Sequence, residues 1–331
     1  MDSLKIYTQS DVLALVNKRE GEIKLGEKVQ IINDLSDLNS SSAKFVLLGI
    51  PEDIGVRANF GVGGTKTVFN AALKALLNIQ SNSFLQGDEL LVLGHFEIEE
   101  PTQTNVEALR NKVNEIDSLV APIIQKIVAA GKVPIVIGGG HNNAYPIIKG
   151  ISEALQQPIN VVNIDAHADL RNTKEGRHSG NGFSFALQEN HLKAYGVFGL
   201  HQNYMHQNLA TYLQENLNLK AFCFEDILQS DKTVLENWLA FTQNIPSPCG
   251  LEIDLDSIEN VLSSAVSPSG FNLNDVRKML LSANKTFSYL HICEGATTLA
   301  NGQQDLKTGK TVAYLVSDFI KALLPRISPQ P

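Results

Sequence analysis

The sequence predicts one α/β domain, a three-layer α/β/α arrangement around a mostly parallel sheet of eight strands. Strand-like runs alternate with helical patterns along most of the 331 residues, which is typical of a parallel sheet with helices on both sides. The strand-like runs are also almost continuously apolar, as strands buried on both faces are. No internal repeat or low-complexity linker indicates a second domain.

The elements are expected in a regular order along the chain. Strands are predicted at residues 44–50, 89–94, 133–138, 159–164, about 194–200, 219–224, 250–255 and 286–293. Helices are predicted up to about residue 77 and near 104–130, 143–155, 204–217, 231–243, 272–284 and 311–324, with a long loop at 168–182. The helix near 104–130 has a single apolar stripe and stops at Gly131. We expect residues 1–43 to form an N-terminal extension packed on a domain of residues 44–331.

Composition excludes several classes of protein. A net charge of −8 without a basic run gives no reason to expect nucleic acid as a partner. No window reaches 18 consecutive apolar residues and no secretory signal is visible, so neither a membrane span nor export is expected. The three scattered cysteines, Cys223, Cys249 and Cys293, indicate reduced core residues. We therefore expect a cytoplasmic protein that acts on a small molecule.

The segment NIDAHADLR (163–171) carries the densest group of potential metal ligands. It follows an apolar run and places Asp165, His167 and Asp169 at every second position. In an extended segment such side chains point to one side. Two carboxylates and an imidazole held together there would repel one another without a cation. The alternative is a polar loop with ordinary solvated acids.

Two further segments make the metal interpretation stronger. His141 follows the apolar run at 133–138, in GGGHNNAYP, and Asp254 and Asp256 end another apolar run, in EIDLD. Six donors therefore lie at the carboxyl ends of three predicted strands, where ligands bind in such sheets. Mostly oxygen donors with a minority of imidazoles suit Mn²⁺ or a similar divalent ion. Six are more than one open site needs, so two ions roughly 3.5–4 Å apart would fit.

The motifs GGGH, DAHAD and DLD, in this order and spacing, resemble the metal motifs of the ureohydrolases over residues 44–325. That superfamily contains arginase, agmatinase, guanidinobutyrase and formimidoylglutamase. The resemblance implies two Mn²⁺ ions, the first held by His141, Asp165, Asp169 and Asp254 and the second by Asp165, His167, Asp254 and Asp256. Two such ions would lower the pKa of a shared water and hold hydroxide for attack on an amidine carbon. Relatives are often trimers or hexamers.

The resemblance also implies a role for Glu294, in HICEGA after the last strand. It matches the family acid that pairs with the amidine-type cation of the substrate. Without the resemblance, an acid at the N-terminus of a helix would be the preferred interpretation. The ligands would also accept Co²⁺, Ni²⁺ or Fe²⁺.

The segment after Ser179 distinguishes branches of the superfamily. Arginases and agmatinases carry a proton-shuttling His two residues after the Asn of Ser-Gly-Asn, whereas this chain has Phe183 two residues after Asn181. Formimidoylglutamases typically have a residue other than His there. His178 could substitute as the shuttle, or could simply be exposed. We expect Ser179 and Asn181 to contact substrate.

A cationic loop gives a second indication of the substrate. Arg171 is followed by Lys174, Arg177 and His178, and N-formimidoyl-L-glutamate carries two carboxylates that such a loop would bind. The same loop would repel agmatine. Arg57, in GVRANFG, resembles the formimidoylglutamase version of the rim loop and adds a further candidate contact. For Lys174 and Arg177 the alternative is solvated loop charge.

The leading hypothesis is therefore a dinuclear Mn²⁺ hydrolase that converts N-formimidoyl-L-glutamate into L-glutamate and formamide in histidine degradation. The alternatives are an arginase or another guanidino-acid hydrolase that releases urea, and a non-catalytic member that binds a small molecule. A single-zinc deacetylase would want a catalytic His pair that is absent near the Gly-rich turns. The Gly-rich segment at 49–67 lacks the G-x-G-x-x-G spacing of a dinucleotide site.

Overall fold

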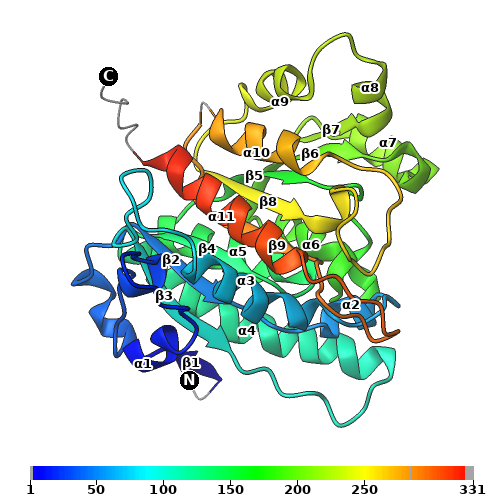
Figure 1. The fold of residues 1–331 in the computed structure, drawn as a ribbon. Helices are drawn as coiled ribbons and strands as arrows, with labels where there is room; N and C mark the ends of the chain where they lie inside the picture. Colours follow the sequence, from blue (N-terminus) through cyan, green and yellow to red (C-terminus); the bar gives the residue numbers. More distant parts are fainter. Residues whose placement is uncertain (1–2, 284, 325–331) are drawn as a thin grey trace.

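A nine-stranded sheet forms the middle of the molecule (Figure 1), in a computed structural model that describes residues 3–283 and 285–324. The strand order is β1-β3-β2-β4-β9-β8-β5-β6-β7. All neighbouring strands are parallel except β1, which pairs antiparallel with β3. The strands are β1 (Leu4–Ile6), β2 (Phe45–Gly49), β3 (Leu90–Phe96), β4 (Val133–Ile137), β5 (Ile159–Ile164), β6 (Leu192–Leu200), β7 (Leu219–Cys223), β8 (Cys249–Asp254) and β9 (Leu290–Cys293).

The three-layer α/β/α arrangement is confirmed, because helices pack on both faces of the sheet (Figure 1). On one face lie α1 (Gln9–Leu13), α3 (Val68–Leu77), α8 (Phe224–Gln229), α9 (Val234–Thr242), α10 (Leu273–Leu281) and α11 (Thr308–Leu323). The other face is covered by α2 (Ile54–Ala58), α4 (Val106–Ala129), α5 (Ala144–Leu155), α6 (Gly182–Gln188) and α7 (Gln207–Glu215). Successive residues of a central strand point to opposite faces, and both are buried, as for Ile135 and Val136 of β4.

The predicted count of eight strands was wrong by one. The additional strand, β1, has only three residues and adds to the edge of the sheet through Leu4, opposite Phe96. So short a segment has no recognisable alternation, and only its partner strand reveals it. The strand predicted at 286–293 is shorter and begins at Leu290. Short helices α2, α6 and α8 were also missed, and the predicted helix end at residue 284 lies outside the described residues.

The segment before β2 packs against the same sheet. Leu25 and Val29 belong to the apolar cluster on the α3 face, whereas Ile32 and Leu38 belong to the cluster on the α4 face. Gln30 forms an isolated parallel bridge with Leu91. The segment therefore contributes to both layers beside β3. Over the described ranges, 3–283 and 285–324, no helix combines the length and apolar character needed to cross a membrane.

The topology brings four functional segments to one edge of the sheet. The turns after β4, β5, β8 and β9 all leave the carboxyl ends of parallel strands, and these strands lie side by side in the order β4-β9-β8-β5. The chain therefore reaches β5 by crossing over two strands that it adds later. Ligand sites of open α/β sheets lie outside the carboxyl ends of strands in this way.

Candidate metal centre

The first group of candidate ligands surrounds His141, which follows β4. Its Nδ1 atom lies 2.9 Å from Asp169 Oδ2, 3.2 Å from Asp254 Oδ2 and 3.3 Å from Asp165 Oδ2. These four side chains come from the ends of β4, β5 and β8, and their donor atoms are mutually close enough to bind one ion. The structure thus brings together the four residues that the resemblance implied for the first ion.

The second group surrounds His167, two residues beyond Asp165. Its Nδ1 atom lies 3.0 Å from Asp256 Oδ2 and 3.6 Å from Asp165 Oδ1. Asp165 therefore offers one carboxylate oxygen to each group. Asp254, the other residue expected to bridge, has its donor atom grouped with the first set only.

Electrostatics within the two groups favour a bound cation. Burial raises the pKa of Asp254 well above its ordinary value, and the neighbouring Asp256 and Asp165 carboxylates raise it further. Burial disfavours the charged form of His167, but Asp165 and Asp256 outweigh it and raise its pKa to about 12. Among the described residues, neither His141 ring nitrogen nor Asp256 Oδ1 has a well-aligned hydrogen-bond partner. Convergent buried oxygen and imidazole donors of this kind fit hard divalent ions.

Two site residues have a left-handed backbone, which only glycine adopts freely. Asp169 has φ +48° and Glu294 has φ +61°. Such conformations cost of order 1–3 kcal/mol and gather at functional sites. Glu294 Oε1 accepts a hydrogen bond from the backbone N–H of His141 at 2.8 Å. Burial, with the nearby Asp169 and Asp256, raises the pKa of Glu294 to about 8.

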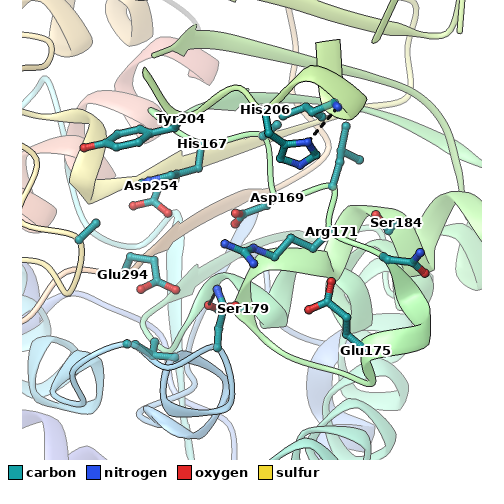
Figure 2. A pocket seen from close by; sticks show the side chains of 18 of the residues that line it. His167, Asp169, Arg171, Glu175, Ser179, Ser184, Tyr204, His206, Asp254 and Glu294 are labelled. Atoms are coloured by element: carbon teal, nitrogen blue, oxygen red, sulfur yellow. Dashed lines mark hydrogen bonds between the residues drawn. The ribbon is translucent and has the colours of Figure 1, made fainter. Parts of the chain in front are cut away.

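A cavity of about 900 Å³ opens over these groups (Figure 2). Its wall includes the metal-ligand candidates His167, Asp169, Asp254 and Asp256, together with Glu294. Sequence reasoning also expected Arg171 and Ser179 here, and both line the cavity. The wall also includes polar and aromatic side chains that it did not single out, among them Asn59, Tyr204, His206, Asn208, Tyr212 and Ser264.

Among the described residues of the cavity wall, Arg171 is the only arginine or lysine. Figure 2 shows its side chain extending between Asp169 and Ser179 on the side of Glu294. Its stem lies against Gly180, where an added Cβ would come within 3.0 Å of Arg171 Cδ, so glycine permits the close approach. Within residues 3–283 and 285–324, no acidic side chain forms an ion pair with Arg171. The guanidinium is therefore available to a ligand.

Comparison with known proteins identifies the family of this site. The model of the arginase family matches residues 43–320. The chain belongs to the arginase family. It is 26% identical over 319 residues to a formimidoylglutamase of Geobacillus thermodenitrificans, an alignment that covers 92% of this chain and 91% of the relative.

Solved structures show the same fold. A formimidoylglutamase from Bacillus subtilis superimposes with a TM-score of 0.74 at 18% identity, covering 93% of this chain and 94% of that one. The Trypanosoma cruzi formiminoglutamase with Mn²⁺ gives a TM-score of 0.72 at 19% identity, covering 92% and 100%. The family membership confirms the resemblance to ureohydrolases and the expected class, a metal-dependent hydrolase.

Several residues expected to contact substrate lie elsewhere in this arginase-family site. The Arg57 guanidinium pairs with Asp53, at 2.8 Å, and with Glu100. Asn181 is buried, and its Oδ1 accepts hydrogen bonds from Arg177 and from the backbone N–H of His178. Neither Arg57 nor Asn181 belongs to the cavity wall that the described residues form.

Two of the cations expected in the loop beside the metal ligands, Arg177 and Lys174, do not line the described cavity wall. Arg177 is buried, bonds Asp117 through two nitrogens at 2.7 and 3.1 Å, and lies over the rings of Tyr145 and Phe185. It anchors the loop to α4 and α5 instead of facing the cavity. Lys174 is exposed and is not part of the described cavity wall.

His178, the expected substitute for the shuttle His, is also buried and lies outside the described cavity wall. Its Nδ1 accepts the backbone N–H of Gly180, and its Nε2 lies 3.4 Å from Glu175 Oε2. Burial and the nearby arginines, Arg110, Arg171 and Arg177, lower its pKa to about 3. The imidazole is therefore neutral in the folded protein at neutral pH.

This low pKa predicts acid sensitivity. An unfolded chain takes up a proton at His178 near pH 6.5, whereas the folded chain does not until about pH 3. Below pH 6.5 the free energy of unfolding should therefore fall, by about 1 kcal/mol per pH unit from this residue. Urea unfolding of the metal-free protein between pH 6 and 4 should show a shallower fall for His178→Asn. His206→Asn is the matched control, since His206 also accepts a backbone N–H but is exposed; equal slopes for all three proteins would contradict the prediction.

Two buried carboxylates were missed by sequence reasoning. Glu52 accepts hydrogen bonds from the backbone N–H groups of Ile54, Gly55 and Gly140 and from the amide of Asn143, at 2.6 to 3.1 Å. It thereby ties the segment after β2 to the loop that carries His141. The second, Glu252 of β8, lies behind His141. For Glu252 a sequence signal was available, because in EIDLD it stands two residues before Asp254 and therefore on the same side of the strand.

Proposed function

We propose that this arginase-family hydrolase cleaves N-formimidoyl-L-glutamate to L-glutamate and formamide, a reaction of histidine degradation, at a centre of two Mn²⁺ ions. The observation that carries the choice of substrate is the Arg171 guanidinium inside the cavity, which lies beside the metal-ligand candidates and has no acidic partner among the described residues. The name of the Geobacillus relative and the Mn²⁺ of the T. cruzi structure support it.

Each of the two donor groups would hold one ion. His141, Asp165, Asp169 and Asp254 would hold one ion, and His167 and Asp256, with Asp165 shared, would hold the other. Bound divalent ions supply Lewis acidity and lower the pKa of water, which makes a nucleophile available near neutral pH. The protein's own contribution would be to hold the amidine carbon of the substrate beside the metal centre.

Arg171 and Glu294 would orient the substrate from opposite ends. A guanidinium binds a carboxylate in a bidentate manner, and Arg171 is placed to take one of the two carboxylates of the substrate. Without a bound cation the pKa of Glu294 is raised to about 8. A cation beside this carboxyl favours its charged form, so Glu294 would face the protonated formimidoyl nitrogen as a carboxylate. Water adds its oxygen to the formimidoyl carbon and the bond from that carbon to the glutamate nitrogen breaks. Both water protons end on that nitrogen, which leaves as the ammonium group of glutamate, and the carbon, with its oxygen and its other nitrogen, becomes formamide.

The position of Phe183 supports a branch other than arginase. This residue occupies the place of the family's shuttle His in arginases, and here it is fully buried. Its ring packs at 5.1 Å from the His141 ring and 4.3 Å from Tyr195. It supplies an apolar wall to the ligand His141 and no titratable group. For agmatine, a dication, Arg171 would be repulsive.

Product release by Mn²⁺-loaded protein tests this proposal, with formimidoylglutamate, arginine, agmatine and guanidinobutyrate offered side by side. We expect glutamate and formamide from the first alone. Arg171→Ala should raise KM for formimidoylglutamate about tenfold, because an exposed charge pair contributes about 1 kcal/mol or slightly more. Lys174→Ala, which removes a cation of the same loop outside the described cavity wall, should leave KM unchanged. Urea from a guanidino compound would overturn the choice of substrate.

A further inference from the structure

The imidazole of His141 lies between two carboxylates of one strand. Glu252 and Asp254 are two residues apart on β8, so their side chains point to the same face of the sheet. His141 Nδ1 lies 3.2 Å from Asp254 Oδ2, and His141 Nε2 lies 3.5 Å from Glu252 Oε2. One ring nitrogen therefore faces the candidate metal centre and the other faces Glu252.

Two side chains of the next strand hold Glu252 in place. In the pairing of β8 with β9, His291 lies directly opposite Glu252. Tyr289 Oη donates to Glu252 Oε1 at 2.5 Å, and His291 Nδ1 lies 2.5 Å from Glu252 Oε2. The Tyr289 ring packs over Gly250, where an added Cβ would lie 1.8 Å from its Cε1 atom. Glycine at that position leaves room for the ring.

These contacts determine where the protons lie. A carboxylate can only accept hydrogen bonds, so His291 Nδ1 and Tyr289 Oη must donate to Glu252. His141 Nε2 lies 3.5 Å from Glu252 Oε2, at the outer limit of hydrogen-bond distance. A proton on Nε2 leaves the lone pair of Nδ1 free, directed at Asp165, Asp169 and Asp254.

We propose that Glu252, held by Tyr289 and His291, is a positioning residue that sets the tautomer of His141 and strengthens it as a metal ligand. The proposal rests on the metal centre of the proposed function and adds the support behind it. A carboxylate that accepts the second ring N–H of a ligand His orients the ring and increases its basicity, and its loss typically lowers metal affinity 10- to 100-fold.

The same cluster could be considered as a metal site of its own, because His141, Glu252, His291 and Cys293 are mutually close. Three observations favour hydrogen bonds instead. Both oxygens of Glu252 already have short partners. All four side chains are buried, and the described cavity wall includes none of them. His141 can direct Nδ1 to the main centre only if Nε2 keeps its proton.

The test is Mn²⁺ binding by metal-free protein, measured by calorimetry for the unaltered chain and for Glu252→Gln. Glutamine has nearly the same shape but no charge, and we expect the affinity of one of the two Mn²⁺ binding steps, the one at His141, to fall about 10- to 100-fold. The matched control is Asp318→Asn, which removes a buried carboxylate bonded to Arg277, outside the described cavity wall. It should leave Mn²⁺ affinity unchanged. Urea unfolding of each variant checks the fold.

A second variant and a spectroscopic measurement keep the proposal open to refutation if Glu252→Gln does not fold. Tyr289→Phe keeps the ring over Gly250 and removes one hydrogen bond to Glu252, so affinity should fall about threefold. In ¹⁵N spectra of the metal-free protein, His141 Nε2 should carry the proton in the unaltered chain. The proposal would be overturned if a folded Glu252→Gln variant bound Mn²⁺ with unchanged affinity. It would also be overturned if the unaltered chain bound a third ion that this variant loses. Absence of Mn²⁺ binding by the unaltered chain would instead overturn the metal centre itself.

Discussion

An Asp165→Asn variant should lose at least about 1,000-fold in kcat/KM toward its amidine substrate and should bind fewer than two Mn²⁺ ions per chain. Asp165 directs Oδ2 to the His141 group and Oδ1 to the His167 group, so one substitution weakens both. Asparagine keeps the shape of the side chain and an oxygen for the His167 backbone N–H, which Asp165 Oδ1 accepts at 2.7 Å. The loss should therefore reflect charge and coordination, not collapse of the loop.

Metal content by elemental analysis and steady-state kinetics measure this effect together. Burial raises the pKa of Asp165, but the hydrogen bonds and charges of His141 and His167 outweigh it and lower that pKa, so removal of the charge should make the metal-free protein less stable at neutral pH. A variant that still folds, with less metal and little activity, is the expected combination. Two ions per chain in a folded Asp165→Asn protein would show that the two groups do not share this carboxylate.

The candidate metal ligands could be predicted from sequence because each group follows an apolar run, and all of them except His141 recur at a spacing of two. Asp165, His167 and Asp169 lie in one short segment directly after β5, although that segment is not extended throughout, since Asp169 has φ +48°. A parallel sheet brings the ends of its strands to one edge. Local pattern and topology were therefore sufficient to propose these residues, whose donor atoms lie in two groups in the structure.

Side chains whose role depends on a distant partner could not be predicted in this way. Lys174 and Arg177 are both loop cations in sequence, but only Arg177 is buried, because Asp117 lies 60 residues earlier on α4 and receives it. Glu252 and His291 meet because β9 is inserted between β4 and β8. Strand order is a long-range property that periodicity does not contain.

The second large effect is expected at Glu294, where glutamine should lower kcat/KM about 100-fold while two Mn²⁺ ions remain bound. Loss of one partner of a buried charge pair costs a few kcal/mol, and the proposed partner is the cationic formimidoyl group. A glutamine oxygen can still accept the His141 backbone N–H that Glu294 accepts at 2.8 Å. The ligand loop should therefore keep its position, and the loss should appear in turnover.

Glu175→Gln is the matched control, because Glu175 also lines the cavity (Figure 2) but is exposed. Its kcat/KM should stay within about twofold of the unaltered protein, since exposed charges contribute little. Metal content then separates the two functional carboxylates: Asp165→Asn should lose metal and activity together, whereas Glu294→Gln should lose activity alone. If Glu294→Gln loses metal in proportion to activity, Glu294 acts by holding the His141 loop. Another acidic residue would then have to bind the cationic group of the substrate.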